Sequence, residues 1–160
     1  MSKALACVVV AALPAVLAAH HVPNRGAAAP QIASGHTVLI VNGAERTFDF
    51  GAVRQADGSV SGQARLDNEA TGLTATLALD CLVIDGNLAR IGGTIVRSNF
   101  GNVGANVVFH AEDNGARPDD LPDRVSHGFI TGASCETFEI PANHPGRLAD
   151  LDRGAVHIRD

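Results

Sequence analysis

The residues whose types and spacing are best suited to binding or catalysis lie in the stretch DNGARPDDLPDRVSHGF, residues 113–129. Four aspartates, Asp113, Asp119, Asp120 and Asp123, fall within eleven residues of it, beside an Asn-Gly pair and two prolines. Calcium prefers about six to eight oxygen ligands, and carboxylates are foremost among them. The cluster therefore defines a candidate calcium site, and we expect no other cofactor.

The same cluster also has a purely structural interpretation. Its spacing is not that of an EF-hand, whose loop alternates its ligands and ends on glutamate. Asp113, Asn114 and Gly115 form a favourable turn sequence, and aspartate next to proline is common in loops. Arg117 and Arg124 lie close enough in sequence to compete with a cation for the carboxylates. A calcium site and a solvated structural corner therefore remain alternatives.

Two histidines flank the acidic stretch on predicted neighbouring strands. His110 precedes it and His127 follows it, and a histidine with a carboxylate such as Asp113 is the minimum for acid–base catalysis. The sequence contains no nucleophile elbow, phosphate-cradling glycine loop or zinc motif to accompany them. A hydrolase using this region is therefore an alternative, while the sequence favours a protein that is not an enzyme.

The first residues of the chain have the layout of a secretory signal peptide. Lys3 gives a positive start, residues 4–17 are almost wholly apolar, and the small residues Ala18 and Ala19 follow. The apolar run is shorter than the roughly 20 residues that span a bilayer, and no later stretch is long enough either. We expect a signal peptide over residues 1–19, no membrane span in the mature chain, and a secreted, periplasmic or cell-surface protein.

The segment after the predicted cleavage site is rich in alanine and proline and has no periodicity. We expect residues 20–35 to form a flexible leader and residues 36–160 to form a single β domain. Cleavage after Ala18 would place His21 third in the mature chain, where it suits square-planar copper or nickel. Chance matches to so short a pattern are frequent, so an unstructured leader is the alternative.

Charge and aromatic content argue against several kinds of partner. The formal net charge is −5, and Lys3 is the only lysine, so removal of the signal peptide makes the chain more acidic. Nucleic acid and anionic membrane surfaces require a basic face. Trp and Tyr are absent, and these residues usually supply the platforms of sugar-binding and single-strand nucleic-acid sites. We therefore expect an unknown protein or a small apolar ligand as partner.

Cys81 and Cys135 are the two cysteines that remain once Cys7 has left with the signal peptide. An even count in an exported chain predicts a disulfide. This bond would close a loop of about 54 residues, and chain entropy alone then gives roughly 4 kcal/mol of stabilisation. Two buried free thiols are the alternative, whereas neither cysteine has a second ligand at zinc-site spacing.

A period of two in the apolar residues runs through the chain from residue 36 onward. Together with turn sequences such as Asn-Gly and Asp-Gly, it predicts strands at 36–41, 46–54, 59–66, 73–83, 88–97, 106–112, 124–130, 136–140 and 154–159. One face of the fourth strand is expected to carry Leu73, Ala75, Leu77, Leu79, Cys81 and Val83. The pair Gly92 and Gly93 in the fifth predicts a bulge or a sharp bend.

This pattern predicts an all-β fold, because no segment has a convincing helical period. Consecutive hairpins indicate an antiparallel meander, and a meander of this length should close into a small β-barrel, since a flat sheet exposes two edges. Glycines inside the strands suit the strong coiling of such a barrel. The last strand, over residues 155–158, would pair with the first. A two-sheet β-sandwich is the alternative.

Three stretches, RTFDFGAVRQADGSVSGQARLDN, LDCLVIDGNLARIGGTIV and VVFHAEDNGARPDDLPDRVS, carry a resemblance to a known kind of domain. They resemble an uncharacterised secreted bacterial all-β domain, in which a Phe-x-Phe strand leads to a Gly-Ser-Val-x-Gly strand and later an Asp-Asn-Gly corner. That domain occurs alone or beside cell-surface sorting modules. The resemblance covers about residues 43–126; it implies the fold and export, and no catalytic residues.

These observations lead to one expected function and two alternatives. We expect a secreted, non-enzymatic structural or interaction module whose partner the sequence does not name. The first alternative is a carrier of a small apolar ligand, because barrels of about eight strands can hold a ligand inside. The second is the hydrolase that would use His110, His127 and Asp113.

Overall fold

The computed structural model describes residues 28–117 and 119–160, so the predicted signal peptide over 1–19 and residues 20–27 of the expected leader lie outside the described residues. The described part contains no helix, and hence none of a length and apolarity that could cross a membrane. Its ten strands are β1 (Gln31–Val41), β2 (Ala44–Arg54), β3 (Val60–Asn68), β4 (Leu73–Asp85), β5 (Leu88–Ser98), β6 (Asn106–Glu112), β7 (Arg124–Val125), β8 (Phe129–Ile130), β9 (Ala149–Asp150) and β10 (Arg153–Arg159).

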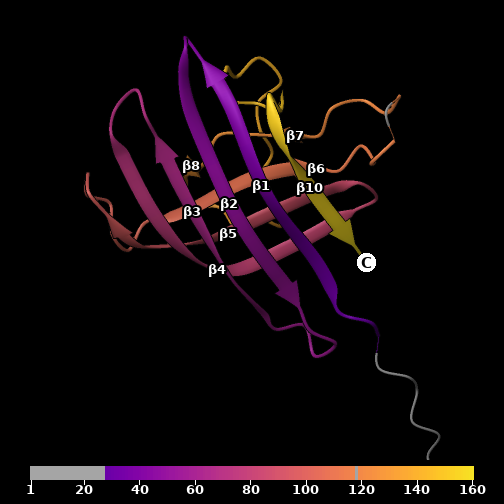
Figure 1. The fold of residues 1–160 in the computed structure, drawn as a ribbon. Helices are drawn as coiled ribbons and strands as arrows, with labels where there is room; N and C mark the ends of the chain where they lie inside the picture. The colour runs from indigo at the N-terminus through magenta and orange to yellow at the C-terminus, as the bar shows by residue number, and fades with distance from the viewer. Residues whose placement is uncertain (1–27, 118) are drawn as a thin grey trace, which may run out of the picture.

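The strands form one curled antiparallel sheet. Its order is β10-β1-β2-β3-β4-β5-β6-β7-β9, and β8 pairs with β6 beside β7. The sheet curls into a half-barrel in which β5 and β6 cross the direction of β1 and β2 at a steep angle (Figure 1). The predicted all-β antiparallel meander is confirmed, including the pairing of the last strand with β1. The alternative, a sandwich of two separate sheets, is wrong, because the described strands belong to one sheet.

The turns that connect the long strands follow the local sequence. Asn42 and Gly43 join β1 to β2 with positive φ angles of 54° and 80°, which is the backbone that a two-residue hairpin of this type requires. Gly86, with φ of 61°, turns the chain between β4 and β5. These turns fix which residues of adjacent strands face each other, and thereby which side chains point inward.

The interior of the half-barrel is filled by phenylalanine and aliphatic side chains. The ring of Phe109 on β6 lies 4.7 Å from that of Phe48 and 5.3 Å from that of Phe50, both on β2. Small residues line the walls around these rings: Ala33, Ala52, Ala64, Ala75, Ala89 and Ala111. Alanine allows opposite walls to approach closely, so this small sheet can enclose a close-packed core.

The first strand begins earlier than expected. β1 starts at Gln31, so residues 31–35 belong to the sheet and the predicted leader over residues 20–35 is wrong for this part. Gln31 pairs with Arg54 of β2, and Ile32 pairs with Arg159 of β10. Backbone pairing on both sides therefore sets where the strand begins, whereas the sequence of residues 31–35 has no clear hydrophobic alternation.

The expected bulge near the paired glycines is present, but the extra residue lies in β4. Leu79 pairs with Gly93 and Cys81 pairs with Gly92, which leaves Asp80 without an opposite residue. This insertion reverses the alternation, because a shift of one residue moves every later side chain to the other face. Leu82 consequently points into the core, and the prediction that Cys81 and Val83 share the face of Leu79 is wrong.

The chain after β6 contains less strand than predicted. The strand expected over residues 124–130 is interrupted, because the His127 amide donates to the Gly146 carbonyl rather than to β6, leaving only β7 and β8. The strand expected over residues 136–140 does not form. The amides of Thr137 and Phe138 both donate to the Ser134 carbonyl, so the chain turns there.

Candidate functional site

Two of the four aspartates in the acidic stretch join the open edge of β10 to the end of β6. One carboxylate oxygen of Asp113 accepts a hydrogen bond from the Ile158 amide at 2.9 Å, and Oδ2 of Asp123 accepts one from the Val156 amide at 2.7 Å. Their other oxygens accept from backbone amides of the same loop, at Gly115 and Asn114. These carboxylates therefore complete the sheet where strand pairing ends.

The remaining two aspartates lie further out in the same loop. Asp120 accepts a hydrogen bond of 2.7 Å from the amide of Arg117, and Asp119 is exposed. Among residues 28–117 and 119–160, no three histidine, cysteine, aspartate or glutamate side chains are grouped as a metal site requires. The geometry accounts for Asp113 and Asp123 as structural groups, as the alternative of a structural corner requires, and calcium binding by the stretch stays an untested hypothesis.

The disulfide between Cys81 and Cys135 is present, and it lies on the outer face of the sheet. The cysteines are 54 residues apart in the chain, and their Cα atoms are 6.0 Å apart. A Cβ at Gly92 of β5 would lie 3.2 Å from the Cβ of Cys135 and 3.3 Å from that of Cys81. Glycine at this position therefore leaves room for the disulfide to lie directly against the strand.

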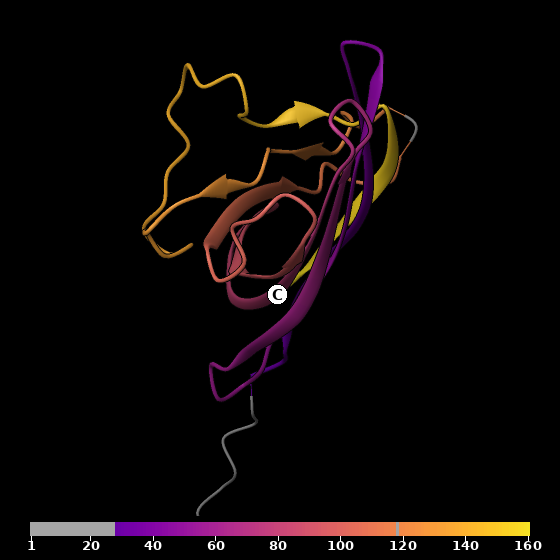
Figure 2. The same cartoon turned by 90° about the vertical axis from the view of Figure 1, so that its left-hand side faces the viewer.

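The disulfide fixes the segment 131–148 on the outer side of β6. This segment, which connects β8 to β9, lies on the opposite side of β6 from β1 and β2 (Figure 2). Phe138 from the segment packs its ring 5.4 Å from that of Phe129 on β8, and the ring of His144 lies 4.9 Å from that of Phe129. The outer face of β6 is thus covered by a second, smaller packed layer.

A cleft of about 260 Å³ lies between this segment and the sheet. Its lining comprises His110 of β6, Arg124 of β7, and Glu139, Ile140, Pro141, Ala142, Arg147 and Leu148 of the covering segment. A neutral ring, three charged groups and four apolar residues therefore converge there. This is the usual composition of a small-molecule site, in which a few polar groups orient a ligand against apolar walls.

His110 lies in the floor of this cleft and is 5% exposed. Its ring packs edge-on against Phe138 at 6.1 Å, and its Nε2 is buried with no hydrogen-bond partner among the described residues. Burial lowers the pKa of His110, and the charge of Arg90 adds to this, against the opposing effects of Glu139 and the Phe138 backbone. The ring is therefore neutral at pH 7, and Nε2 is available for a further hydrogen bond.

The charged groups around the cleft differ in whether they are paired. Arg90 binds the carboxylate of Glu139 at 2.9 Å, and Arg124 lies 3.2 Å from the carboxylates of both Glu112 and Asp150. Arg147 has no carboxylate within ion-pair distance in the part of the chain that the structure describes. Arg147 is therefore the one charged group of the lining without an ion-pair partner among the described residues, while the second carboxylate on Arg124 keeps the summed charge around the cleft near zero.

The predicted partnership of His110 with His127 is not formed, because the His110 ring packs against Phe138 whereas the His127 ring is hydrogen-bonded to Arg46. Nε2 of His127 lies 2.8 Å from a guanidinium nitrogen of Arg46 on β2 and accepts its hydrogen bond. Burial lowers the pKa of His127, and electrostatic interactions with Arg46 and His144 lower it further. Asp113, the third member of the hydrolase hypothesis, binds β10 instead. The predicted catalytic group is therefore not assembled.

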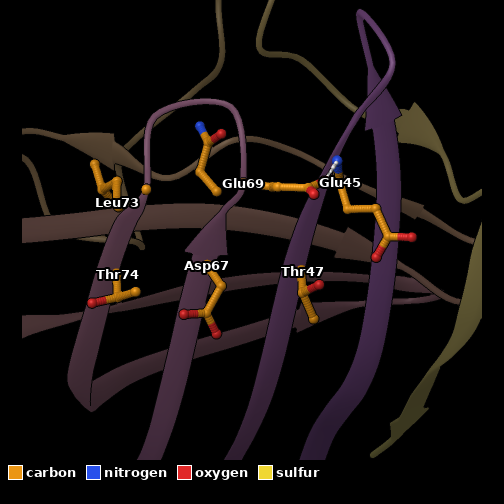
Figure 3. Close-up of a pocket in the computed structure, with 8 residues that line it drawn as sticks. Glu45, Thr47, Asp67, Glu69, Leu73 and Thr74 are labelled. Atoms are coloured by element: carbon orange, nitrogen blue, oxygen red, sulfur yellow. Dashed lines mark hydrogen bonds between the residues drawn. The ribbon is translucent and has the colours of Figure 1, made fainter.

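A second depression, larger and more open at about 510 Å³, lies on the outer face where β2 and β4 begin and β3 ends (Figure 3). Thr47, Asp67 and Thr74 stand side by side across these strands, as their pairing requires. Glu69 accepts a hydrogen bond of 3.0 Å from the amide of Glu45. The carboxylates of Asp67 and Glu45 are engaged as well, by Arg65 and Arg153 respectively. This depression therefore has no unpaired carboxylate with which to act on a substrate.

Most of the cleft residues were not indicated by the sequence. Residues 131–148 carry only the short strand predicted over 136–140, which does not form, and no recognisable motif, so nothing marked Glu139 or Arg147 as members of a site with His110. The one local signal was the even pair of cysteines, which placed Cys135 against a strand. The copper or nickel prediction for His21 lies outside the described residues.

Comparison with known proteins adds no relative to this description. No protein-family model, no curated protein and no solved structure matches the chain. The resemblance to a secreted bacterial all-β domain therefore stays a prediction, and the function must be argued from the chain itself.

Proposed function

We propose that this chain is an exported, non-enzymatic structural or interaction module that acts at or outside the cell surface. The observation that carries the proposal is the filled interior of the half-barrel, where the rings of Phe48, Phe50 and Phe109 pack together. A carrier of apolar ligands needs an internal cavity in the place that these rings occupy. The packed interior supports a module that works through its outer surface.

The disulfide supports the exported location. Disulfides form and persist in oxidising compartments and are rare where thiols are kept reduced. The bond between Cys81 and Cys135 joins the sheet to a segment with little regular structure, so that segment depends on oxidation for its position. Together with the signal-like sequence of residues 1–19, this supports a role outside the cytoplasm.

Exposed apolar side chains near the β5–β6 turn support an interaction role. Phe100 and Val103 are 56% and 63% exposed, and Val96 in the preceding strand is 51% exposed. The turn folds back on β5, because the amide of Gly104 donates to Ile95 and the amide of Ile95 to Ala105. Contiguous exposed apolar patches mark interaction sites, and three such side chains on one hairpin support this role.

The experiment is a binding assay with intact cells of the organism that makes the protein. The processed protein is labelled and added to cells, and the bound fraction is measured against concentration. We expect saturable binding that falls at least about tenfold for Phe100→Ser with Val103→Ser, since apolar anchors carry most of an interface's energy. Leu121→Ser is the matched control, because Leu121 is equally apolar and 75% exposed but lies in the acidic stretch.

Two results would overturn this function. One is the absence of saturable binding, or equal binding by the double variant and the wild type. The other is tight, stoichiometric uptake of an apolar fluorescent probe that is lost when Phe109→Trp fills the interior further, because that result would favour the carrier. Turnover is not expected in either assay.

A further inference from the structure

The cleft beside His110 has walls that are held in place from several directions. The covering segment is tied to the sheet by the Cys81–Cys135 disulfide near its start and by the pairing of β9 with β7 after its end. Between these points the guanidinium of Arg90 holds both the Glu136 carbonyl and the Glu139 carboxylate. A cleft fixed in this way is pre-formed, so little of the binding free energy of a ligand is lost in ordering the protein.

The polar groups of the cleft differ in how many ion-pair and hydrogen-bond partners they have. Glu139 and Arg124 both have charged partners, but Arg147 makes only one side-chain hydrogen bond within the described residues, at 3.3 Å to the Ala142 carbonyl. In the floor, Nε2 of His110 has no partner. A buried polar atom without a partner is costly and calls for an explanation. One explanation is a ligand that supplies the missing partner.

We propose that this cleft binds a small organic acid, with its carboxylate on Arg147 and its apolar body against Ile140, Pro141 and Leu148. The ligand's remaining polar group, or a water that it orders, hydrogen-bonds to Nε2 of His110. This site lies on the outer face of the sheet, goes beyond the proposed interaction role and does not depend on it.

The size and chemistry of the cleft narrow the ligand class. Its volume of about 260 Å³ is below the roughly 300–1,000 Å³ of sites for drug-sized molecules, so the ligand is small. An inorganic phosphate would leave the four apolar residues of the lining without contact and would bring more negative charge near Glu139. A singly charged acid with a branched or aromatic body can pair its carboxylate with Arg147 and pack its apolar part against the apolar side chains of the lining.

The test is a titration of ¹⁵N-histidine-labelled protein with isobutyrate, benzoate and inorganic phosphate, followed by the NMR signals of the imidazole nitrogens. We expect Nε2 of His110 to shift saturably with the two organic acids, with a dissociation constant of about 1 mM or lower. Benzamide, which has the same body as benzoate without its charge, should bind at least about tenfold more weakly. Phosphate should give no saturable shift at His110.

Two variants separate the site from a general charge effect. Arg147→Gln removes the unpaired cation from an exposed position and should weaken benzoate binding at least about tenfold. Arg97→Gln removes an exposed arginine from β5 that does not line the cleft, and should leave binding unchanged. The proposal is overturned if no acid shifts His110, if benzamide binds as well as benzoate, or if the two variants behave alike. Failure here would leave the cell-binding assay of the proposed function unaffected.

Discussion

The carboxylate of Asp123 accepts a hydrogen bond of 2.7 Å from the backbone amide of Val156, 33 residues further along the chain. A second bond of the same kind joins Asp113 to the amide of Ile158. Both amides belong to the edge of β10 that does not pair with β1. Unpaired strand edges invite association with other chains, and here two side chains occupy the donors. The acidic stretch thus closes the sheet by side chains where backbone pairing stops.

Replacement of Asp123 by alanine should destabilise the protein by about 1–3 kcal/mol for each buried amide left without an acceptor. Two amides are affected, those of Val156 and Asn114. Urea unfolding of the wild type and the variant measures the difference. Asp119→Ala is the control, because this exposed aspartate should tolerate the change within about 0.5 kcal/mol. Equal losses for both variants would contradict the closing role of Asp123.

Removal of the disulfide should lower the free energy of unfolding by roughly 4 kcal/mol, as expected for a loop of 54 residues. The variant is Cys81→Ser with Cys135→Ser, measured by thermal and urea unfolding. Reduction of the wild type should give a similar loss, whereas reduction of the double variant should change nothing. A wild type that is insensitive to reductant would show that the bond is absent in solution or carries no stability.

Gly93→Ala should destabilise the protein strongly, because a Cβ at this position would overlap the backbone of Ala78 and Leu79 beside the bulge. Backbone atoms of a paired strand cannot move aside as a flexible side chain does. Gly51→Ala is the matched control, since Gly51 is also a strand glycine but has open space where its Cβ would lie. We expect a loss of about 2 kcal/mol or more for the first and little change for the second, by urea unfolding.

Stability should fall as the pH is lowered through the ordinary pKa of histidine, about 6.5. The pKa values of His110 and His127 are both lowered in the folded protein, mainly by burial. Below the ordinary pKa the unfolded chain therefore binds protons that the folded chain does not, and the free energy of unfolding decreases. Urea unfolding at several values between roughly pH 7.5 and 5.5 measures the slope.

The control for this slope is the double variant His110→Gln with His127→Gln. It should be less stable at neutral pH but should lose less stability on acidification. A slope as steep as that of the wild type would assign the pH dependence to other groups.

Calcium should not stabilise the protein appreciably, because the carboxylates of Asp113 and Asp123 already accept backbone hydrogen bonds. Thermal unfolding of the processed protein with calcium and with a chelator tests this expectation. A rise of several degrees that saturates with calcium would contradict it and establish a cation site. Substitution of Asp119 and Asp120 by asparagine would then be expected to abolish the rise.

The turns and most strands could be predicted because their signals are local. Asn42 and Gly43 specify a hairpin by their own backbone preferences, and strict alternation marks β2 and the first half of β4. The disulfide was predictable from the two cysteines that remain once Cys7 is assigned to the signal peptide. Local signals failed where a neighbouring strand decided the outcome. The start of β1 depends on β10, and the face of Cys81 depends on the bulge opposite Gly92 and Gly93.

The sequence by itself determined the all-β class, the antiparallel meander and the disulfide, because alternation, turn residues and paired cysteines act over short stretches or by simple count. Only the tertiary structure decided the roles of the candidate site residues. Asp123 is hydrogen-bonded to Val156, and His110 lines one cleft with the covering segment, because the sheet curls and brings together residues far apart in the chain. No local pattern encodes such a meeting, since it depends on the summed twist and register of every strand in between.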